Sequence, residues 1–549
     1  MASFQRSAIR TGHRSGGFGA RLARGPRVLP LLLLFVAWIP GASAGRGYLC
    51  VEGGGAPGTA PWCASVFGWM VQRAGGGPAL VVSTSDPGTK ARDAFLLYGA
   101  SSAATLVVTA ANAEADAVHD AVAAARIVWF TGGDQAGYVQ AWKGTRFART
   151  VREVWEGGGV VGGSSAGAHI LSDVVFDAFN GSAYGRDTLR DPYTPLVSFT
   201  TDFFAFTENV LFDTHFTERA RIGRLPVFLA RLAETGRDVL GVGLDDCTAL
   251  CIDPDRIAEV RGEGAVTLIQ STGATRRLLE PGKPPVFTHL LLTQLTEGYR
   301  YDLAGRHLAG RPPAAVPAPG YAPAPVFLDG TVNGEVETDA RKGAVWFDDT
   351  GDDLALFHGA LREMPGTGQL GGAVLGTRVW ESGAWDENRA GGVEYGLALH
   401  PGYVGFLLDY GVRVTSSGPA RLTINPATEQ ESALLVLDSA GMGSIAFSTY
   451  VSSSASVGPR QSVALESATL HLLRSGWSYD AVARRPAAPP LPGDLDGDER
   501  VTALDAVLLH RFLAGTLAEI ALCAANADAD GNGRVDAADA LKVLLLAVP

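Results

Sequence analysis

The sequence predicts an α/β protein with a parallel sheet in its first half, a β-rich region in its middle and a small α-helical module at its end. In the first half, short apolar runs alternate with helical stretches, and their continuous apolar character is typical of parallel strands buried on both faces. In the middle, runs with alternating apolar positions lie between turns rich in glycine and serine, as in antiparallel β-structure. At the end, two acidic loops each lead into an apolar helix. A chain of 549 residues is too long for one domain.

The first 44 residues predict a signal peptide. Arginines between Arg6 and Arg27 form a basic region, Val28 to Pro40 form an apolar core, and Ala42-Ser43-Ala44 offers small residues for cleavage. The core is too short to span a bilayer comfortably. We therefore predict secretion, with no membrane span after cleavage. An uncleaved anchor is the alternative.

Charge and cysteine content restrict the function further. The net charge of −12 argues against a nucleic-acid partner, because phosphate binding needs basic patches. Export makes disulfides possible. The spacing favours two local pairs, Cys50 with Cys63 and Cys247 with Cys251, which leaves Cys523 unpaired. The same spacings do not predict a zinc site, because no histidine pairs complete a ligand set.

The segment 45–310 is predicted to be one α/β domain. Its helices are expected at Val66–Arg73, Ala113–Ala125 and Tyr138–Trp155. Its strands are expected at Tyr48–Val51, Ala79–Ser83, Thr105–Val108, Ile127–Phe130 and Gly159–Val161. Ligands of parallel sheets bind beyond the carboxyl ends of the strands. Gly53–Gly55, Gly132–Gln135 and Ser165 all fall at such ends, so this edge is the candidate site.

The pattern Gly163-x-Ser165-x-Gly167 between a strand and a helix predicts a nucleophile elbow. A Gly-rich turn without chemistry is the alternative in a chain with 69 glycines. A serine nucleophile needs a histidine base and an acid that orients this base. His215 is the candidate base. The segment also offers His119, His169 and His289, and a lone histidine is more often structural.

Four motifs in order resemble the cyanophycinases and their relative peptidase E, which are serine peptidases. The motifs are Thr131-Gly132-Gly133-Asp134-Gln135, Gly163-Ser164-Ser165-Ala166-Gly167, Asp213-x-His215-Phe216-x-x-Arg219-x-Arg221-x-x-Arg224-Leu225, and Gly241-x-Gly243-x-Asp245-Asp246-x-Thr248-Ala249. The resemblance covers about half of the chain. It implies a flavodoxin-like or class-I-amidotransferase-like parallel sheet and a catalytic mechanism that needs no cofactor.

The resemblance also implies roles for individual residues. Ser165 would be the nucleophile, His215 the general base and Asp246 the acid that orients His215. The family usually has glutamate at the last position, so Asp246 is a departure and the adjacent Asp245 is an alternative. The backbone amides of Gly133 and Ala166 would form the oxyanion hole.

The substrate-binding residues implied by the resemblance are Gln135, Asp213, Thr214, Arg219, Arg221 and Arg224. On a helix, Arg221 and Arg224 would share a face while Arg219 would lie elsewhere. Arginines that are solvated or ion-paired are the alternative. Thr214 stands where cyanophycinases tend to have glutamine, so the polymer cyanophycin is in doubt as the substrate.

Two proline-rich linkers, 311–325 and 481–493, enclose the β-rich region 326–480. Strands are expected at Gly402–Leu408, Val412–Val414, Arg421–Ile424 and Leu434–Leu437. They predict a small antiparallel β-domain without a catalytic constellation. Whether this region folds alone or completes the first domain is left open by the sequence.

Residues 494–549 contain two loops with oxygen-bearing side chains at positions 1, 3, 5 and 12, which is a calcium pattern. The ligands are Asp494, Asp496, Asp498 and Asp505 in the first loop and Asp528, Asp530, Asn532 and Asp539 in the second. The pair of loop–helix units resembles a dockerin, which implies calcium as cofactor and a cohesin-like partner. Glu499 stands where glycine is expected, so the second loop should bind calcium more tightly.

The sequence therefore predicts a secreted, calcium-binding serine hydrolase that cleaves peptide or amide bonds, including β-aspartyl or acidic-residue-linked bonds, in a peptide or polypeptide substrate. Two other functions are considered. The chain could be a catalytically inactive binding or scaffold protein, or an esterase or amidase that acts on non-peptide substrates.

Overall fold

The computed structural model describes residues 46–318, short strands between 326 and 376, and most of 389–547. The predicted signal peptide lies outside the described residues, so it stays a prediction. Among the described residues, no helix is both long and apolar enough to cross a membrane.

The first sheet combines parallel strands with an antiparallel extension. Its order is β16 (His307–Gly310), β15 (Arg300–Asp302), β11 (Ile257–Gly262), β10 (Thr248–Ile252), β1 (Tyr48–Glu52), β5 (Val160–Ser164), β4 (Ile127–Phe130), β2 (Ala79–Ser83) and β3 (Ala103–Val107). The strands from β1 to β3 are parallel, as the sequence predicts. Strand β10 runs antiparallel to β1, and the order from there to β16 is antiparallel.

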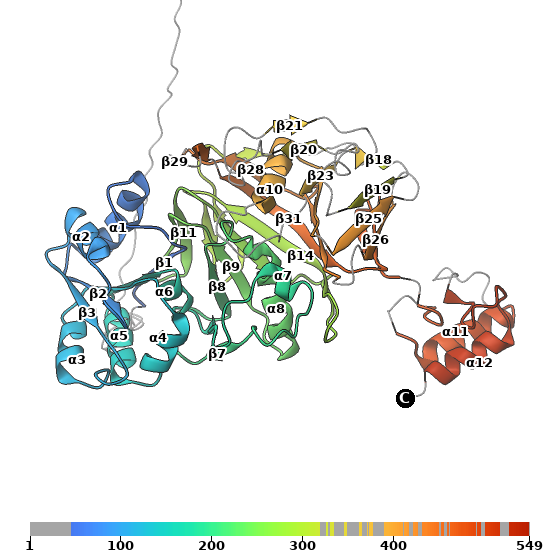
Figure 1. Ribbon diagram of the computed structural model, residues 1–549, viewed down its shortest axis with the longest axis horizontal. Helices are drawn as coiled ribbons and strands as arrows, with labels where there is room; N and C mark the ends of the chain where they lie inside the picture. Colours follow the sequence, from blue (N-terminus) through green and yellow to red (C-terminus); the bar gives the residue numbers. More distant parts are fainter. Residues whose placement is uncertain are drawn as a thin grey trace, which may run out of the picture. The chain divides into compact units, whose positions relative to one another are not determined.

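Helices cover both faces of the parallel strands (Figure 1). One face packs on α1 (Pro61–Arg73) and α2 (Lys90–Leu97) through residues such as Val81 and Trp129. The other face packs on α3 (Asp116–Ala123), α4 (Gln135–Trp142) and α5 (Arg146–Glu156) through residues such as Val82 and Phe130. Burial on both faces explains the continuous apolar sequences of the inner strands, whereas β3, at the edge of the sheet, is half-exposed.

The expected helix Tyr138–Trp155 is two helices, α4 and α5. Lys143 is extended at the end of α4, and Gly144 has a φ of +78°, a conformation that glycine adopts without steric cost. Thr145 then caps α5 by accepting a hydrogen bond from the Ala148 backbone N–H. Gly144 and Thr145 are typical turn and cap residues. The apolar positions on both sides of them nevertheless predict one continuous helix.

A second sheet begins in the first half of the chain and continues through the middle region. Its main path is β8 (Val210–Thr214), β9 (Leu240–Leu244), β12 (Val266–Gln270), β14 (Val286–Leu295), β31 (Val463–Leu473), β27 (Leu434–Asp438), β24 (Val404–Leu407), β23 (Ala373–Gly376), β20 (Val345–Asp348) and β21 (Arg362–Met364). Three further strands join it at the side: β13 (Arg276–Leu278), β17 (Val316–Pro317) and β28 (Ser444–Phe447).

The pairing of β14 with β31 joins the middle region to the first half. One apolar cluster contains Phe287 and Leu292 of β14 together with Leu470 of β31 and Val393 of α10 (Arg389–Leu399). Of the two alternatives left open by the sequence, the strand pairing therefore favours a middle region that completes the first domain. The region is also not wholly antiparallel, because β23 runs parallel to β20 and β24. The residue boundaries of the domains stay a prediction.

The remaining elements form smaller units. The strand pairs are β6 (Val174–Phe176) with β7 (Phe199–Thr201), β18 (Val326–Phe327) with β22 (Leu370–Gly371), and β29 (Ser452–Ser454) with β30 (Gly458–Arg460). A small sheet has the order β19 (Gly330–Asn333), β25 (Val412–Ser416), β26 (Arg421–Pro426), β32 (Ser478–Asp480) and β33 (Arg485–Ala487). The other helices are α6 (Ala166–His169), α7 (Gly185–Thr188), η1 (Arg221–Gly223), α8 (Leu225–Glu234), α11 (Ala503–Leu513) and α12 (Ala537–Leu546).

The cysteines are not arranged as the spacing predicts. Cys50 lies opposite Cys251 in the β1–β10 ladder, and their Sγ atoms are 3.9 Å apart. Cys247 lies just before β10, so the extended chain between it and Cys251 separates the two by about 13 Å. A disulfide spans less than about 7 Å between Cα atoms. The predicted pair of Cys247 with Cys251 is therefore wrong. The pair of Cys50 with Cys63 stays a prediction, although the Cys50 sulfur lies next to that of Cys251. Cys523 lies outside the described residues.

Candidate active site

Ser165 occupies a strained turn between β5 and α6. Its φ of 53° and ψ of −120° are unusual for a residue with a side chain, and such strain is concentrated at functional sites. The glycines on either side permit the turn. A Cβ on Gly163 would lie 2.4 Å from the Gly167 carbonyl oxygen, and one on Gly167 would lie 2.4 Å from the Phe130 carbonyl oxygen. The turn has the geometry of a nucleophile elbow.

Ser165, His215 and Asp246 form a hydrogen-bonded chain. The Ser165 Oγ lies 2.7 Å from His215 Nε2, and the His215 Nδ1 lies 2.5 Å from Asp246 Oδ1. With the Nδ1 proton donated to Asp246, Nε2 is left to accept the hydroxyl proton of Ser165. This is the geometry that a serine nucleophile needs.

The three residues come from two sheets. Ser165 follows β5 of the first sheet, whereas His215 follows β8 and Asp246 follows β9 of the second. The His215 backbone N–H donates to the Gly53 carbonyl oxygen at 3.1 Å, directly after β1. A Cβ on Gly54 would come within 2.3 Å of both the His215 ring and the Asp246 carboxylate. Glycine at position 54 therefore lets the chain that follows β1 pass close to His215 and Asp246.

Burial lowers the pKa of His215 below its ordinary value, and the hydrogen bond and negative charge of Asp246 only partly oppose this shift. The side chain of His215 is 8% exposed and that of Asp246 is 22% exposed. A low pKa keeps the imidazole neutral at physiological pH, as a general base requires.

Asp245 points away from His215. Its carboxylate accepts hydrogen bonds from the backbone N–H groups of Thr217 (3.1 Å) and Ala265 (2.9 Å), and from the Thr217 hydroxyl. Burial raises the pKa of Asp245 to about 6 despite these donors. The structure therefore brings Asp246, not Asp245, to the histidine.

Two buried glutamates beside the triad were missed by the sequence analysis. Glu52 Oε1 accepts from the Gly54 N–H at 2.9 Å, and Glu218 Oε1 accepts from the Asp246 N–H at 3.2 Å. Burial raises the pKa of both well above the ordinary value, which favours their neutral forms. Their only sequence signal is position, since Glu52 precedes Gly53 and Glu218 lies three residues after His215.

The loop after β4 lies next to Ser165. A Cβ on Gly132 would be 3.3 Å from the Ser165 Cβ, and both Gly132 and Gly133 are exposed. The Tyr138 hydroxyl lies 3.0 Å from the Thr131 carbonyl oxygen and 3.1 Å from that of Gly132. Tyr138 therefore supports the loop that carries Gly133. The residue gives no signal in the sequence beyond its place on a helix.

Asp213, Arg221 and Arg224 form a buried ion cluster. Arg224 donates to both oxygens of Asp213, from Nε at 2.9 Å and from Nη2 at 2.5 Å. Arg221 donates to Asp213 at 3.3 Å and to the Thr214 carbonyl oxygen. Burial alone would raise the pKa of Asp213, but the two guanidinium groups hold it below its usual range. Arg221 and Arg224 are therefore ion-paired in the structure, which is the alternative that the sequence left open.

The remaining predicted binding residues differ in exposure. Thr214 is buried, and its Oγ1 lies 3.2 Å from His169 Nε2. Arg219 is half-buried in a turn, and the segment from Arg219 to Arg224 is not one continuous helix, so the expected helical faces do not apply. Gln135 is half-buried at the start of α4, where its Nε2 donates to the Phe176 carbonyl oxygen at 3.4 Å. Substrate binding stays a prediction for this set, and only Arg219 and Gln135 have accessible surface of any extent.

The other candidate histidines contact side chains outside the triad. Burial lowers the pKa of His169 to about 3, so its ring stays neutral beside Thr214. His119 pairs with Thr150 through its Nδ1 at 2.8 Å. The His289 ring packs on that of His471 at 4.8 Å. None of these contacts involves Ser165.

In the terminal module, the second acidic loop brings its carboxylates together. One oxygen each from Asp528, Asp530 and Asp539 lie within 4.8 Å of one another. Asp539 also accepts from the backbone N–H groups of Asp530 (3.1 Å) and Asp536 (2.8 Å), which fixes the start of α12. Convergent oxygen atoms are the ligands that calcium prefers, so these residues fit the ion.

The first loop is described in part. Asp505 accepts from the Leu495 N–H at 2.7 Å and the Thr502 N–H at 2.7 Å, which parallels Asp539 in the second loop. Asp496 and Asp498 lie outside the described residues. Asn532 belongs to the second loop, where its backbone N–H donates to Asp528 at 3.0 Å.

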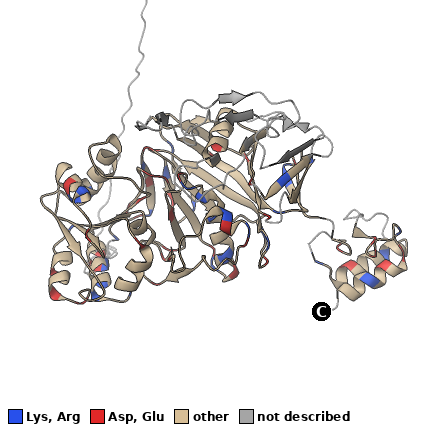
Figure 2. Ribbon diagram, viewed as in Figure 1, with Lys and Arg blue, Asp and Glu red and all other residues tan. Residues whose placement is uncertain are grey.

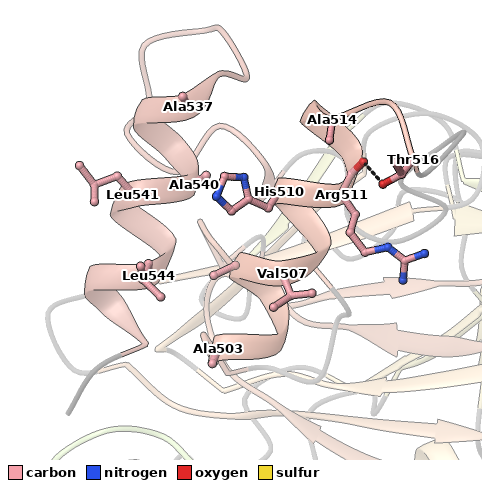
Figure 3. A pocket seen from close by; sticks show the side chains of 11 residues that line it. Ala503, Val507, His510, Arg511, Ala514, Thr516, Ala537, Ala540, Leu541 and Leu544 are labelled. Carbon is pink, nitrogen blue, oxygen red and sulfur yellow. Dashed lines mark hydrogen bonds between the residues drawn. The ribbon is translucent and has the colours of Figure 1, made fainter.

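Helices α11 and α12 of this module enclose a groove of about 630 Å³ (Figure 3). Val507, Leu541 and Leu544 line it, and each is about half exposed. His510 and Arg511 add polar groups. The groove contains none of the residues of the Ser165 site. Elsewhere in the described chain, basic and acidic positions are interspersed (Figure 2).

Comparisons with known proteins find similarity in two parts of the chain. Residues 84–260 match the model of peptidase family S51, and residues 492–544 match that of the dockerin type I domain. Curated proteins named cyanophycinase are similar to this chain. The one from Synechococcus elongatus is 28% identical over 180 residues, which cover 32% of this chain and 52% of that protein. The one from Nostoc sp. is 31% identical over 184 residues, which cover 33% and 57%.

The chain thus spans about half of the length of the curated relatives it matches. A solved peptidase from an acI-B1 Actinobacterium is 20% identical, with 47% of this chain and 98% of that chain covered and a TM-score of 0.35. Similarity to S51 peptidases is therefore combined in one chain with a dockerin type I module.

Proposed function

We propose that this protein is an exported serine peptidase that cleaves amide bonds through Ser165, His215 and Asp246. The match to peptidase family S51 supports the peptidase class. The observation that carries the serine type is the chain of hydrogen bonds from Ser165 through His215 to Asp246, at 2.7 and 2.5 Å.

In the proposed reaction, Ser165 Oγ attacks the carbonyl carbon of the scissile amide while His215 Nε2 takes the hydroxyl proton. The backbone amides of Gly133 and Ala166 would stabilise the resulting oxyanion. His215 then gives its proton to the leaving amine. Water hydrolyses the acyl-enzyme with His215 again as base. Asp246 keeps the histidine in the tautomer that leaves Nε2 as the acceptor.

Labelling with a fluorophosphonate probe tests the nucleophile. The wild-type protein should be labelled and Ser165→Ala should not, and the variant should lose turnover by several orders of magnitude. Ser164→Ala keeps all three triad residues and serves as the matched control, which should still be labelled. A Ser165→Ala protein that keeps more than about a tenth of wild-type turnover would exclude this nucleophile.

We further propose that the substrate presents a carboxylate, as in a β-aspartyl or acidic-residue-linked bond. Arg219 and Arg221 lie near enough to act electrostatically on His215, while Arg221 and Arg224 pair with Asp213. β-Aspartyl dipeptides, cyanophycin, casein and a simple ester should be compared as substrates. Arg219→Gln should raise KM for the acidic substrate, whereas Arg149→Gln, on the exposed face of α5, should not.

The dockerin module supports a second part of the proposal, which is calcium-dependent attachment to a cohesin-like partner. Leu541 and Leu544 are 59% and 47% exposed on α12, which is unusual for leucines in a folded module. Leu541→Asp should abolish binding of a cohesin-type domain in the presence of calcium while the helical content stays unchanged. Unaltered binding would exclude this face as the attachment surface.

A further inference from the structure

Cys50 and Cys251 occupy a position in the β1–β10 ladder that suits a covalent link. The Gly53 N–H donates to the Thr248 carbonyl oxygen at 2.9 Å, so this pair is hydrogen-bonded. Hydrogen-bonded and non-hydrogen-bonded pairs alternate along an antiparallel ladder. Counting back along the register, Cys50 and Cys251 form a non-hydrogen-bonded pair.

Non-hydrogen-bonded pairs have the shorter Cα separation, about 4.5 Å, and their side chains lie closer together. This separation falls inside the range that disulfides span. The Sγ atoms are already 3.9 Å apart, and both side chains are at most 1% exposed. A rotation of the side chains brings the sulfurs to bonding distance without moving either strand.

The other described cysteines have different surroundings. Cys63 lies on α1, where its Sγ accepts from the Gly58 N–H at 3.3 Å. Cys247 precedes β10 at the turn that follows Asp246. The geometry therefore singles out Cys50 and Cys251 among the cysteines that the structure describes.

We propose that Cys50 and Cys251 are joined by a disulfide that ties β1 to β10 beside the active site. The inference rests on the proposed export, because disulfides persist in oxidising compartments. One thiolate attacks a disulfide of the oxidant, which is a protein or small-molecule disulfide. The second cysteine then displaces the oxidant's remaining thiolate. The chain loses two protons and two electrons, and the oxidant's disulfide is reduced to two thiol groups.

The bond forms during folding, before the sheet closes. In the folded protein, burial raises the pKa of Cys50 well above its ordinary value, so little thiolate is present for exchange. The two cysteines are 201 positions apart in sequence. A link across so long a loop restricts the unfolded chain strongly and thereby stabilises the fold.

The link also lies close to the catalytic groups. Strand β1 continues into Gly53, whose carbonyl oxygen accepts from the His215 N–H, and into Gly54, where an added Cβ would collide with His215 and Asp246. Strand β10 begins two residues after Asp246. Joining the strands therefore holds the backbone around His215 and Asp246 in a fixed register.

Peptide mapping of the full chain tests the proposal without reference to activity. The protein is produced in an oxidising compartment and in a reducing one, blocked with iodoacetamide while unfolded, and digested without reductant. We expect a peptide with Cys50 linked to Cys251 only in the oxidised preparation. Free thiols at both positions there, or a link from Cys50 to Cys63, would overturn the proposal.

Urea unfolding adds a second measurement. The oxidised wild type should unfold at a higher urea midpoint than the reduced wild type, and Cys50→Ala/Cys251→Ala should have the same midpoint in both preparations. Cys63→Ala, which removes another buried thiol, should keep the difference between oxidised and reduced protein. Equal midpoints of the oxidised and reduced wild type would contradict a stabilising link. Loss of peptidase activity with the linked peptide intact would concern the proposed function alone.

Discussion

Two adjacent aspartates after β9 have opposite orientations. Asp246 lies 2.5 Å from His215 Nδ1, whereas Asp245 is held by Thr217 and Ala265. Asp245 directly follows β9 and Asp246 lies in the turn after it, and of the two it is Asp246 that contacts the histidine. Aspartate has a shorter side chain than glutamate. Asp246 still reaches His215, because β8 and β9 are neighbours in the sheet.

The two aspartates should therefore differ in mutational effect. Asp246→Asn should lower kcat by about 10⁴-fold, because the orienting carboxylate of a triad acts at that scale. Asp245→Asn should lower kcat less than about tenfold and act mainly on the unfolding temperature, because it removes a buried acceptor. Steady-state kinetics and thermal unfolding of both variants check this. The reverse order of sensitivity would assign the acid role to Asp245.

The low pKa of His215 predicts a pH profile. The neutral imidazole is the active form, so kcat/KM should rise with pH through an acid limb and then reach a plateau. Because burial lowers the pKa, the midpoint of the limb should lie below the ordinary value of about 6.5. Asp246→Asn removes the carboxylate that stabilises the protonated ring of His215. The acid limb of the remaining activity should therefore have its midpoint at a lower pH. A limb above pH 7 would contradict this account of His215.

At the scale of elements, β14 decides how the two halves of the chain are joined. It pairs with β12 on one side and with β31 on the other. Helix α10 of the middle region also reaches the catalytic half. Burial raises the pKa of its Glu394 to about 8, and the nearby charge of Asp245 adds to the shift. The middle region is therefore part of the support beneath the site.

This arrangement predicts the outcome of two truncations. Deletion of residues 311–549 removes β31 and leaves β14 as an exposed apolar edge, which is an aggregation site. Deletion of residues 491–549 removes only the terminal module. The first truncation should be insoluble or inactive, and the second should keep kcat/KM within about twofold. Soluble expression and peptidase assays distinguish them. An active 46–310 fragment would show that the middle region is dispensable.

At the scale of the whole molecule, calcium should act on the terminal module alone. The module has its own small core around Leu509 and Val543, and carboxylates converge in its second loop. So small a core supplies little stability without a ligand. An ion at 100 times its Kd would add about 2.7 kcal/mol to the stability of the module.

In calorimetry of the full chain, EDTA should therefore remove or lower one thermal transition and leave the main one within about 2 °C. Asp528→Ala/Asp530→Ala should abolish the response. Asp494→Ala should weaken it less, because Glu499 replaces the glycine expected in the first loop and we expect that loop to bind calcium more weakly. The protein without residues 491–549 is the control and should not respond to calcium. A transition of the module that is unchanged in EDTA would exclude a calcium-dependent module.

Much of the candidate site follows from local sequence. The glycines around Ser165 are needed by the turn itself, whereas the roles of His215 and Asp246 were implied by the resemblance of their motifs to a known family. The calcium loops are also local, because their ligands come from twelve consecutive residues. Such features are encoded within short segments and can be read without knowing the fold.

Other features depend on contacts between distant segments, and the sequence does not contain them in readable form. The pairing of Cys50 with Cys251 depends on strand register, whereas spacing suggested neighbours in the chain. The burial of Arg221 and Arg224 against Asp213 depends on how η1 packs beneath β8. The union of β14 with β31 joins segments more than 160 residues apart. The sequence by itself determined the chemistry of the site, because turns, loops and strand ends are local. Only the tertiary structure decided which groups are exposed, which are neutralised and which cysteines meet, because register and burial arise from packing.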